Sequence, residues 1–139
     1  MLQIGALPFQ VKKGKIQIML ITTTSGGAWI LPKGHPESDL NQAQVAELET
    51  YEEAGVKGKV CNSKLCKDFK CENGGILIIY PLFIKKTLDK WPEDSIRKRR
   101  LVSIKEALNL VTHKEHIKAI KHFSSYENST ILIKISSKW

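Results

Sequence analysis

The sequence lacks the features of disulfide-linked, zinc-binding and membrane-spanning proteins. Its three cysteines, Cys61, Cys66 and Cys71, are odd in number and evenly spaced, which fits neither a disulfide framework nor a Cys-x2-Cys zinc pattern. We therefore expect buried or half-buried thiols in a reducing compartment. No apolar run reaches the roughly 18 residues that span a bilayer, and the N-terminus lacks a basic signal segment. These absences predict a cytoplasmic protein with no membrane partner.

Acidic and aromatic residues are also in short supply. Asp and Glu number 14 against 22 Lys and Arg, so the formal net charge is +8. This surplus predicts an anionic partner without choosing among nucleotides, inositol phosphates, RNA and membrane headgroups. Aromatic residues make up 7% of the chain, and only Trp29, Trp91 and Tyr80 are placed to stack on RNA bases. RNA is therefore a less favoured partner than a small polyphosphate.

The chain contains no internal repeats and no linker. With a hydrophobic share of 42%, residues 1–139 are expected to form one domain with an adequate core. The tail, residues 124–139, contains strand-forming residues at 129–135, but the pattern does not place it. The oligomeric state is equally open.

Apolar periodicity and turn signals divide the chain into strands and helices. They predict a hairpin of strands 3–10 and 16–22, then a helix from about 41 to 54 that ends at Gly55. Further strands are expected at 58–69 and 75–86, and further helices at 104–111 and 114–123. Ser103 and Glu106 predict a capping box at the first of these two helices. His113, His116 and His122 have no carboxylate or cysteine companions at ligand spacing, which predicts surface or capping histidines.

Three carboxylates, Glu49, Glu52 and Glu53, stand at positions i, i+3 and i+4 of the first helix. A helix gathers such residues onto one face, where they repel one another. Small or apolar residues flank this stripe on both sides, which is unusual for a solvated acidic face. A hard divalent cation such as Mg²⁺ removes the repulsion, because carboxylate oxygens are its preferred protein ligands. We therefore favour a metal site over a solvated face.

These residues carry a family resemblance. The chain resembles the Nudix box, Gly-x5-Glu-x7-Arg-Glu-U-x-Glu-Glu-x-Gly-U with U apolar, at Gly34, Glu49, Glu52, Glu53, Gly55 and Val56. Leu40 replaces the first Glu of the box, Leu48 replaces the Arg, and Thr50 replaces an apolar residue. The opening at residues 32–36 and the close at 52–56 resemble one Nudix branch, the bacterial relatives of diphosphoinositol polyphosphate and diadenosine polyphosphate hydrolases. The resemblance covers most of residues 4–123.

The resemblance implies a fold and a chemistry. The expected fold is an α/β/α sandwich with a mixed, partly curled sheet. The expected activity is hydrolysis of a phosphoanhydride bond in a nucleoside or inositol polyphosphate. Glu49, Glu52 and Glu53 would then be both catalytic residues and ligands of Mg²⁺, with Mn²⁺ as an alternative.

Substrate-binding residues are expected in three other segments. The loop at 22–27 offers Thr23 and Thr24 to a phosphate, although a plain polar turn is the alternative. Lys33 and Gly34 would orient the polyphosphate chain. The basic run 97–100 would supply Arg97 and Arg99, whose guanidinium groups bind phosphates bidentately, unless the run is only a solvated charge cluster. Glu93 or Asp94 is a further candidate for the metal site.

Two other functions remain open. One is a catalytically silent Nudix module that binds nucleotide or RNA, an alternative suggested by the departures from the box at Leu40 and Leu48. The other is an RNA 5′-pyrophosphohydrolase, which the excess of basic over acidic residues would permit.

Overall fold

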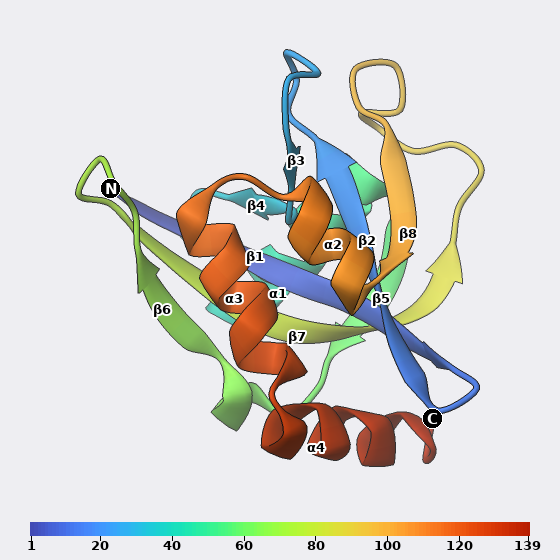
Figure 1. The fold of residues 1–139 in the computed structure, drawn as a ribbon. Coiled ribbons are helices and arrows are strands. Elements are labelled where there is room, and N and C mark those ends of the chain that lie inside the picture. Colours follow the sequence, from blue (N-terminus) through green and yellow to red (C-terminus); the bar gives the residue numbers. More distant parts are fainter.

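The computed structural model describes residues 1–139 as a mixed sheet between two layers of helices (Figure 1). The elements are β1 (Leu2–Lys12), β2 (Lys15–Thr22), β3 (Trp29–Ile30), β4 (Lys33–Gly34), α1 (Gln42–Ala54), β5 (Val56–Val60), a 3₁₀ turn (Ser63–Leu65), β6 (Lys67–Lys70), β7 (Ile76–Thr87), β8 (Arg99–Ser103), α2 (Ile104–Leu110), α3 (Lys114–Ser124) and α4 (Tyr126–Ser136).

The sheet is built around β1. β1 pairs antiparallel with β2 and parallel with β7, so that Ile4 lies opposite Ile78. β8 pairs with β2, and β5 and β6 both pair with β7. Since one pairing is parallel and the others antiparallel, the mixed sheet predicted from the sequence is confirmed.

Alternation along the strands divides the hydrophobic core between the two faces of the sheet. Ile4 and Ala6 of β1 pack under α1, together with Val45 and Ala46 of that helix. Leu7 and Phe9 belong to the larger cluster beneath α2, α3 and α4. The two helical layers of Figure 1 therefore cover opposite faces.

One predicted strand differs in the structure, and the tail, whose placement the pattern left open, is now placed. The expected strand 58–69 is interrupted, because the chain turns at Asn62, where φ is +46°, and continues through a 3₁₀ turn before β6. The tail forms helix α4. Ser125 caps α4 by accepting the N–H of Asn128 at 3.2 Å, and Leu132 is completely buried against the core. Capping and burial together outweigh the strand preference of its β-branched residues.

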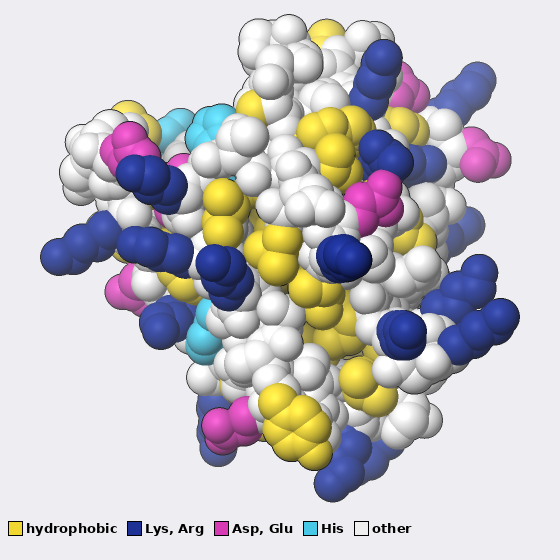
Figure 2. All heavy atoms as spheres, in the orientation of Figure 1, with side chains coloured by type: hydrophobic (Ala, Val, Ile, Leu, Met, Phe, Trp, Pro, Cys, Tyr) yellow, Lys and Arg dark blue, Asp and Glu magenta, His cyan; other side chains and the backbone are white.

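The positive charge is dispersed on the face that carries α2, α3 and α4. Figure 2 shows Lys and Arg side chains spread around this face rather than gathered into one patch. No helix is both long and apolar enough to cross a membrane.

Candidate functional site

Helix α1 holds the three carboxylates in place through a defined cap at each end. Asn41 and Gln44 form a reciprocal capping box at its start. At its end Gly55 adopts φ +65°, and a side chain there would collide with Trp91 and Arg99. Glu53 is buried, while Glu49 and Glu52 are half-buried.

The short strand β4 lies against this acidic face. The backbone N–H of Lys33 donates to Glu53 Oε1 at 3.0 Å. Gly34 faces the Glu49 carboxyl so closely that any Cβ at this position would overlap it. The glycine expected to orient a substrate thus also makes room for a carboxylate of the cluster.

Burial and mutual repulsion dominate the electrostatics of the cluster. Burial raises the pKa of Glu49 to about 7, and the charges of Glu53, Glu52, Glu37 and Glu93 contribute further. The pKa of Glu53 is also raised by burial, which outweighs the opposing effects of the Lys33 N–H and Arg97. The Glu49 side chain has no hydrogen bond or ion pair within the protein, so the cluster favours an added cation.

Arg97 supplies one cation to this cluster from a distant part of the chain. Its guanidinium contacts Glu53 Oε2 at 3.1 Å, Glu93 Oε1 at 2.7 Å and the carbonyl of Thr22 at 2.9 Å. Leu48 occupies the position of the arginine in the Nudix pattern, so a cation reaches the carboxylates by another route.

Arg99 has structural partners at the end of α1. It donates to the carbonyls of Ala54, at 3.0 Å, and of Leu88, and its guanidinium lies 3.9 Å from the Trp91 ring centre. The Trp91 indole N–H donates in turn to the carbonyl of Glu53 at 3.1 Å. Only Arg99 lies within β8, so the two arginines do not share one strand. Contact of either arginine with a phosphate stays a prediction.

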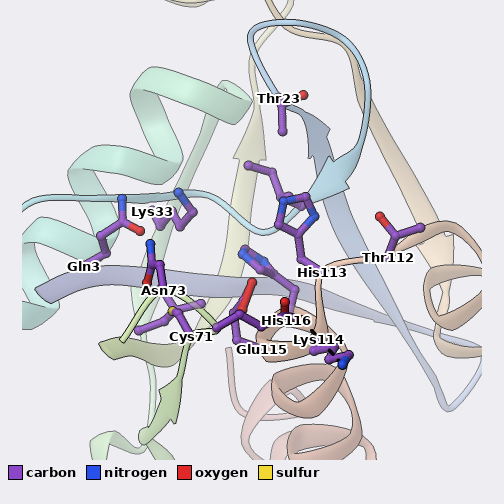
Figure 3. A pocket seen from close by; sticks show the side chains of 13 residues that line it. Gln3, Thr23, Lys33, Cys71, Asn73, Thr112, His113, Lys114, Glu115 and His116 are labelled. Atoms are coloured by element: carbon purple, nitrogen blue, oxygen red, sulfur yellow. Dashed lines mark ion pairs between the residues drawn. The ribbon is translucent and has the colours of Figure 1, made fainter. Parts of the chain in front are cut away.

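A cavity of about 540 Å³ opens beside Lys33 (Figure 3). Gln3, Lys33, Cys71 and Asn73 line one side of it in the figure, with the start of α3 opposite. The full lining comprises Gln3, Thr23, Ile30, Lys33, Cys71, Glu72, Asn73, Leu77, Thr112, His113, Lys114, Glu115 and His116. Of the predicted substrate residues, it includes Thr23 and Lys33, whereas Thr24 is exposed and lies outside it.

His116 departs from the expectation of surface or capping histidines. It is only 1% exposed, and its Nδ1 accepts the N–H of Leu31 at 3.0 Å. Burial lowers its pKa to about 3, and the charges of Lys33 and His113 act in the same direction. The prediction was wrong because His116 lies on the inward face of α3, three, four and seven residues before Ala119, Ile120 and Phe123.

The carboxylate set fits a hard divalent cation, although its geometry does not yet form a complete binding site. As they stand, no three His, Cys, Asp or Glu side chains are arranged to hold a metal ion. Glu49 and Glu52 have no side-chain partners, and both oxygens of Glu53 already accept hydrogen bonds. The half-buried Glu49 carboxylate, which has no partner in the protein and lies on one helix face with Glu52 and Glu53, is the observation that favours a cation here.

Comparison with known proteins identifies relatives along most of the chain. No family model matches the chain. It is 32% identical to Nudix hydrolase 21, chloroplastic, of Arabidopsis thaliana, over 86% of this chain and 64% of the relative. It is likewise 32% identical to Nudix hydrolase 16, mitochondrial, over 78% and 71%. Human diphosphoinositol polyphosphate phosphohydrolase 3-beta is 30% identical, over 67% and 61%.

A solved structure has the same fold. The chain superposes on C. elegans Ap4A hydrolase in a binary complex with a TM-score of 0.75, at 17% identity, covering 91% of this chain and 98% of that one. This likeness confirms the predicted fold class. The chain spans less than two thirds of the length of the first relative named above. Its sequence similarity to Nudix hydrolase 16 covers most of both proteins, and on that ground this chain belongs to the Nudix hydrolase family.

Proposed function

We propose that this chain hydrolyses a phosphoanhydride bond in a nucleoside or inositol polyphosphate in a divalent-metal-dependent reaction. The observation that carries the proposal is the position of Lys33. The backbone N–H of Lys33 donates to Glu53 of the acidic cluster, and Lys33 also lines the polar cavity. A substrate whose head group occupies the cavity would therefore extend its phosphates toward the carboxylates.

The names of two similar proteins support this class of substrate. One relative is named a diphosphoinositol polyphosphate phosphohydrolase, and one structural neighbour an Ap4A hydrolase. Nudix hydrolases generally use divalent metal ions. Several relatives' names include chloroplastic or mitochondrial, so a cytoplasmic location for this chain stays a prediction.

The carboxylates of the cluster and two residues that line the cavity have separate roles in the proposed reaction. Glu49, Glu52 and Glu53 would hold Mg²⁺ or Mn²⁺, which when bound supplies Lewis-acid activation of a phosphoryl group. A carboxylate oxygen of this set that does not bind the metal would accept the proton of the attacking water. Lys33 neutralises charge on the phosphates, and Thr23 donates a hydroxyl hydrogen bond to them.

The structure weighs against the RNA 5′-pyrophosphohydrolase alternative. Trp29 is half-buried against the core, and the Trp91 ring is covered by Arg99. Tyr80 is 9% exposed, and its hydroxyl donates to Gln42. Tyr80 therefore offers no free face on which a base could stack, and Arg99 occupies one face of Trp91.

The test is phosphate release from a panel of diadenosine polyphosphates, diphosphoinositol polyphosphates, ADP-ribose and nucleoside diphosphates. We expect Mg²⁺-dependent turnover of at least one member, abolished by chelation. A purified, folded chain that binds these compounds but hydrolyses none of them with Mg²⁺ or Mn²⁺ would instead support the silent binding module.

A further inference from the structure

The cavity beside Lys33 carries balanced charge, which is unexpected in so basic a chain. Lys33 and Lys114 face Glu72 and Glu115, and most other lining side chains are neutral and polar. Lys114 and Glu72 already pair with each other at 3.5 Å, with both side chains largely exposed. Lys33 and Glu115 are therefore the charges left to meet a ligand.

Glu115 is a buried carboxylate without a partner. It is 9% exposed, and it makes no hydrogen bond or ion pair to any other residue. A carboxylate accepts hydrogen bonds only, and no buried side-chain oxygen or nitrogen of the protein lacks a partner, so the Glu115 oxygens must reach the open cavity. Its side chain therefore suits a ligand that presents N–H or O–H donors to the cavity.

His116 provides the opposite hydrogen-bonding function next to Glu115. Because its Nδ1 accepts the Leu31 N–H, the ring of the neutral histidine carries its proton on Nε2. No protein group accepts that proton, and the residue lines the cavity. Its ring also packs edge-on against His113, with centroids 5.7 Å apart, which fixes its orientation. Figure 3 shows Glu115 and His116 together at the start of α3.

We propose that Glu115 and His116 select the head group of the substrate by binding a donor–acceptor pair, as found in sugar hydroxyls or a purine edge. This inference rests on the proposed function and narrows it, because a densely phosphorylated ring would place anionic oxygens against the Glu115 carboxylate. The cavity volume of about 540 Å³ accommodates a group of nucleoside size. Phosphates attached to such a head group remain free to reach Lys33.

The proposal is tested by binding, without turnover. Calorimetry would compare the parent with Glu115→Gln for three probes: adenosine 5′-monophosphate, ribose 5-phosphate and inositol hexakisphosphate, with and without Mg²⁺. Removing the charge should weaken adenosine monophosphate binding about tenfold, because a hydrogen bond to a charged group is replaced by one to a neutral group. It should strengthen inositol hexakisphosphate binding severalfold. Glu127→Gln is the matched control, since Glu127 is an exposed carboxylate in the first turn of α4.

Comparing adenosine monophosphate with ribose 5-phosphate shows whether the base or the sugar supplies the hydrogen-bond donor to Glu115. An equal loss for ribose 5-phosphate assigns recognition to the sugar hydroxyls, whereas a loss confined to adenosine monophosphate assigns it to the base edge. Both results support the proposal. Glu115→Gln affinities within twofold of the parent, or a parent that binds neither sugar phosphate, would overturn it.

A second variant keeps the test decisive should Glu115→Gln fold poorly. His116→Asn retains an acceptor for the Leu31 N–H but deletes the Nε2–H donor. This variant should also weaken the binding of adenosine monophosphate about tenfold. An unchanged affinity would refute the proposal. These binding experiments do not measure hydrolysis, so their outcome is separate from that of the phosphate-release assay. A chain that shows these binding changes but releases no phosphate in that assay would refute the proposed enzyme and leave the proposed selectivity intact.

Discussion

Arg97 and Glu53 form an ion pair, Nη2 to Oε2 at 3.1 Å, in which the side chains are only 10% and 8% exposed. Removing one partner of such a pair leaves an uncompensated buried charge. We expect Arg97→Met to lower the free energy of unfolding by about 3 kcal/mol in metal-free protein. Urea unfolding provides the measurement.

Arg100→Met is the control for this experiment, since Arg100 and Glu106 form a pair whose side chains are 51% and 42% exposed. Its loss should cost less than about 1 kcal/mol. Adding Glu53→Gln to Arg97→Met should recover much of the stability. Equal effects of the two arginine variants would contradict a buried structural pair.

The carboxylates should control turnover in folded protein, since Arg97 keeps its pair with Glu93 when Glu53 is replaced. Glu53→Gln is expected to lower kcat by at least about 10³-fold, because it removes a metal ligand or base without changing volume. Glu49→Gln should behave similarly and also weaken the apparent metal affinity. Steady-state kinetics, with Glu127→Gln as the control, tests both, and turnover within tenfold of the parent for both variants would refute the assignment.

The affinity of the protein for its metal ion should be weak. Arg97 reaches Glu53 and Glu93, but Glu49 has no protein partner to orient it. Activity is therefore expected to rise well into the millimolar range of Mg²⁺, or to be higher with Mn²⁺. A titration of phosphate release against metal concentration measures this. Saturation at micromolar Mg²⁺ would show that the protein already holds Glu49 in position.

His116 should make the fold sensitive to acid. Its pKa is about 3 in the folded chain and 6.5 in the reference state, so the unfolded chain binds the proton more readily. The stability it contributes is complete above pH 6.5 and is lost as pH falls toward 3. At pH 5 the loss is about 2 kcal/mol.

His116→Asn removes this titration and is the comparison variant. The parent and the variant should differ in the pH dependence of urea unfolding between pH 7.5 and pH 4, with the parent losing more. Parallel curves would show that His116 titrates normally in the folded chain.

Among the predicted residues that the structure brings together, the three carboxylates are related locally. Glu49, Glu52 and Glu53 share a face because helix geometry alone places them there, and Gly34 follows from the box pattern. Long-range placement was harder to predict. Nothing in the basic run at 97–100 distinguishes Arg97, which binds carboxylates, from Arg99, which binds carbonyls at the end of α1.

The cavity was missed for the same reason. Its lining comes from β1, β3, β4 and β7, from the segments after β2 and β6, and from the start of α3 and the residues just before it. The parallel pairing of β1 with β7 places Gln3 opposite Leu77. His116 could have been found from its spacing to Ala119, Ile120 and Phe123. Glu115 had no such signal, because a glutamate in the first helical turn is ordinarily a solvated residue.

The distance along the chain between α1 and its partners has a kinetic consequence. Helix α1 closes its first cap locally, through Asn41 and Gln44, whereas Arg97 lies 44 residues from Glu53 and Trp91 lies 38 residues away. Contacts across such separations form late, because loop closure must come first. The acidic helix therefore exists for a time without its counterion, and a divalent cation present during that interval should speed the final stage of refolding.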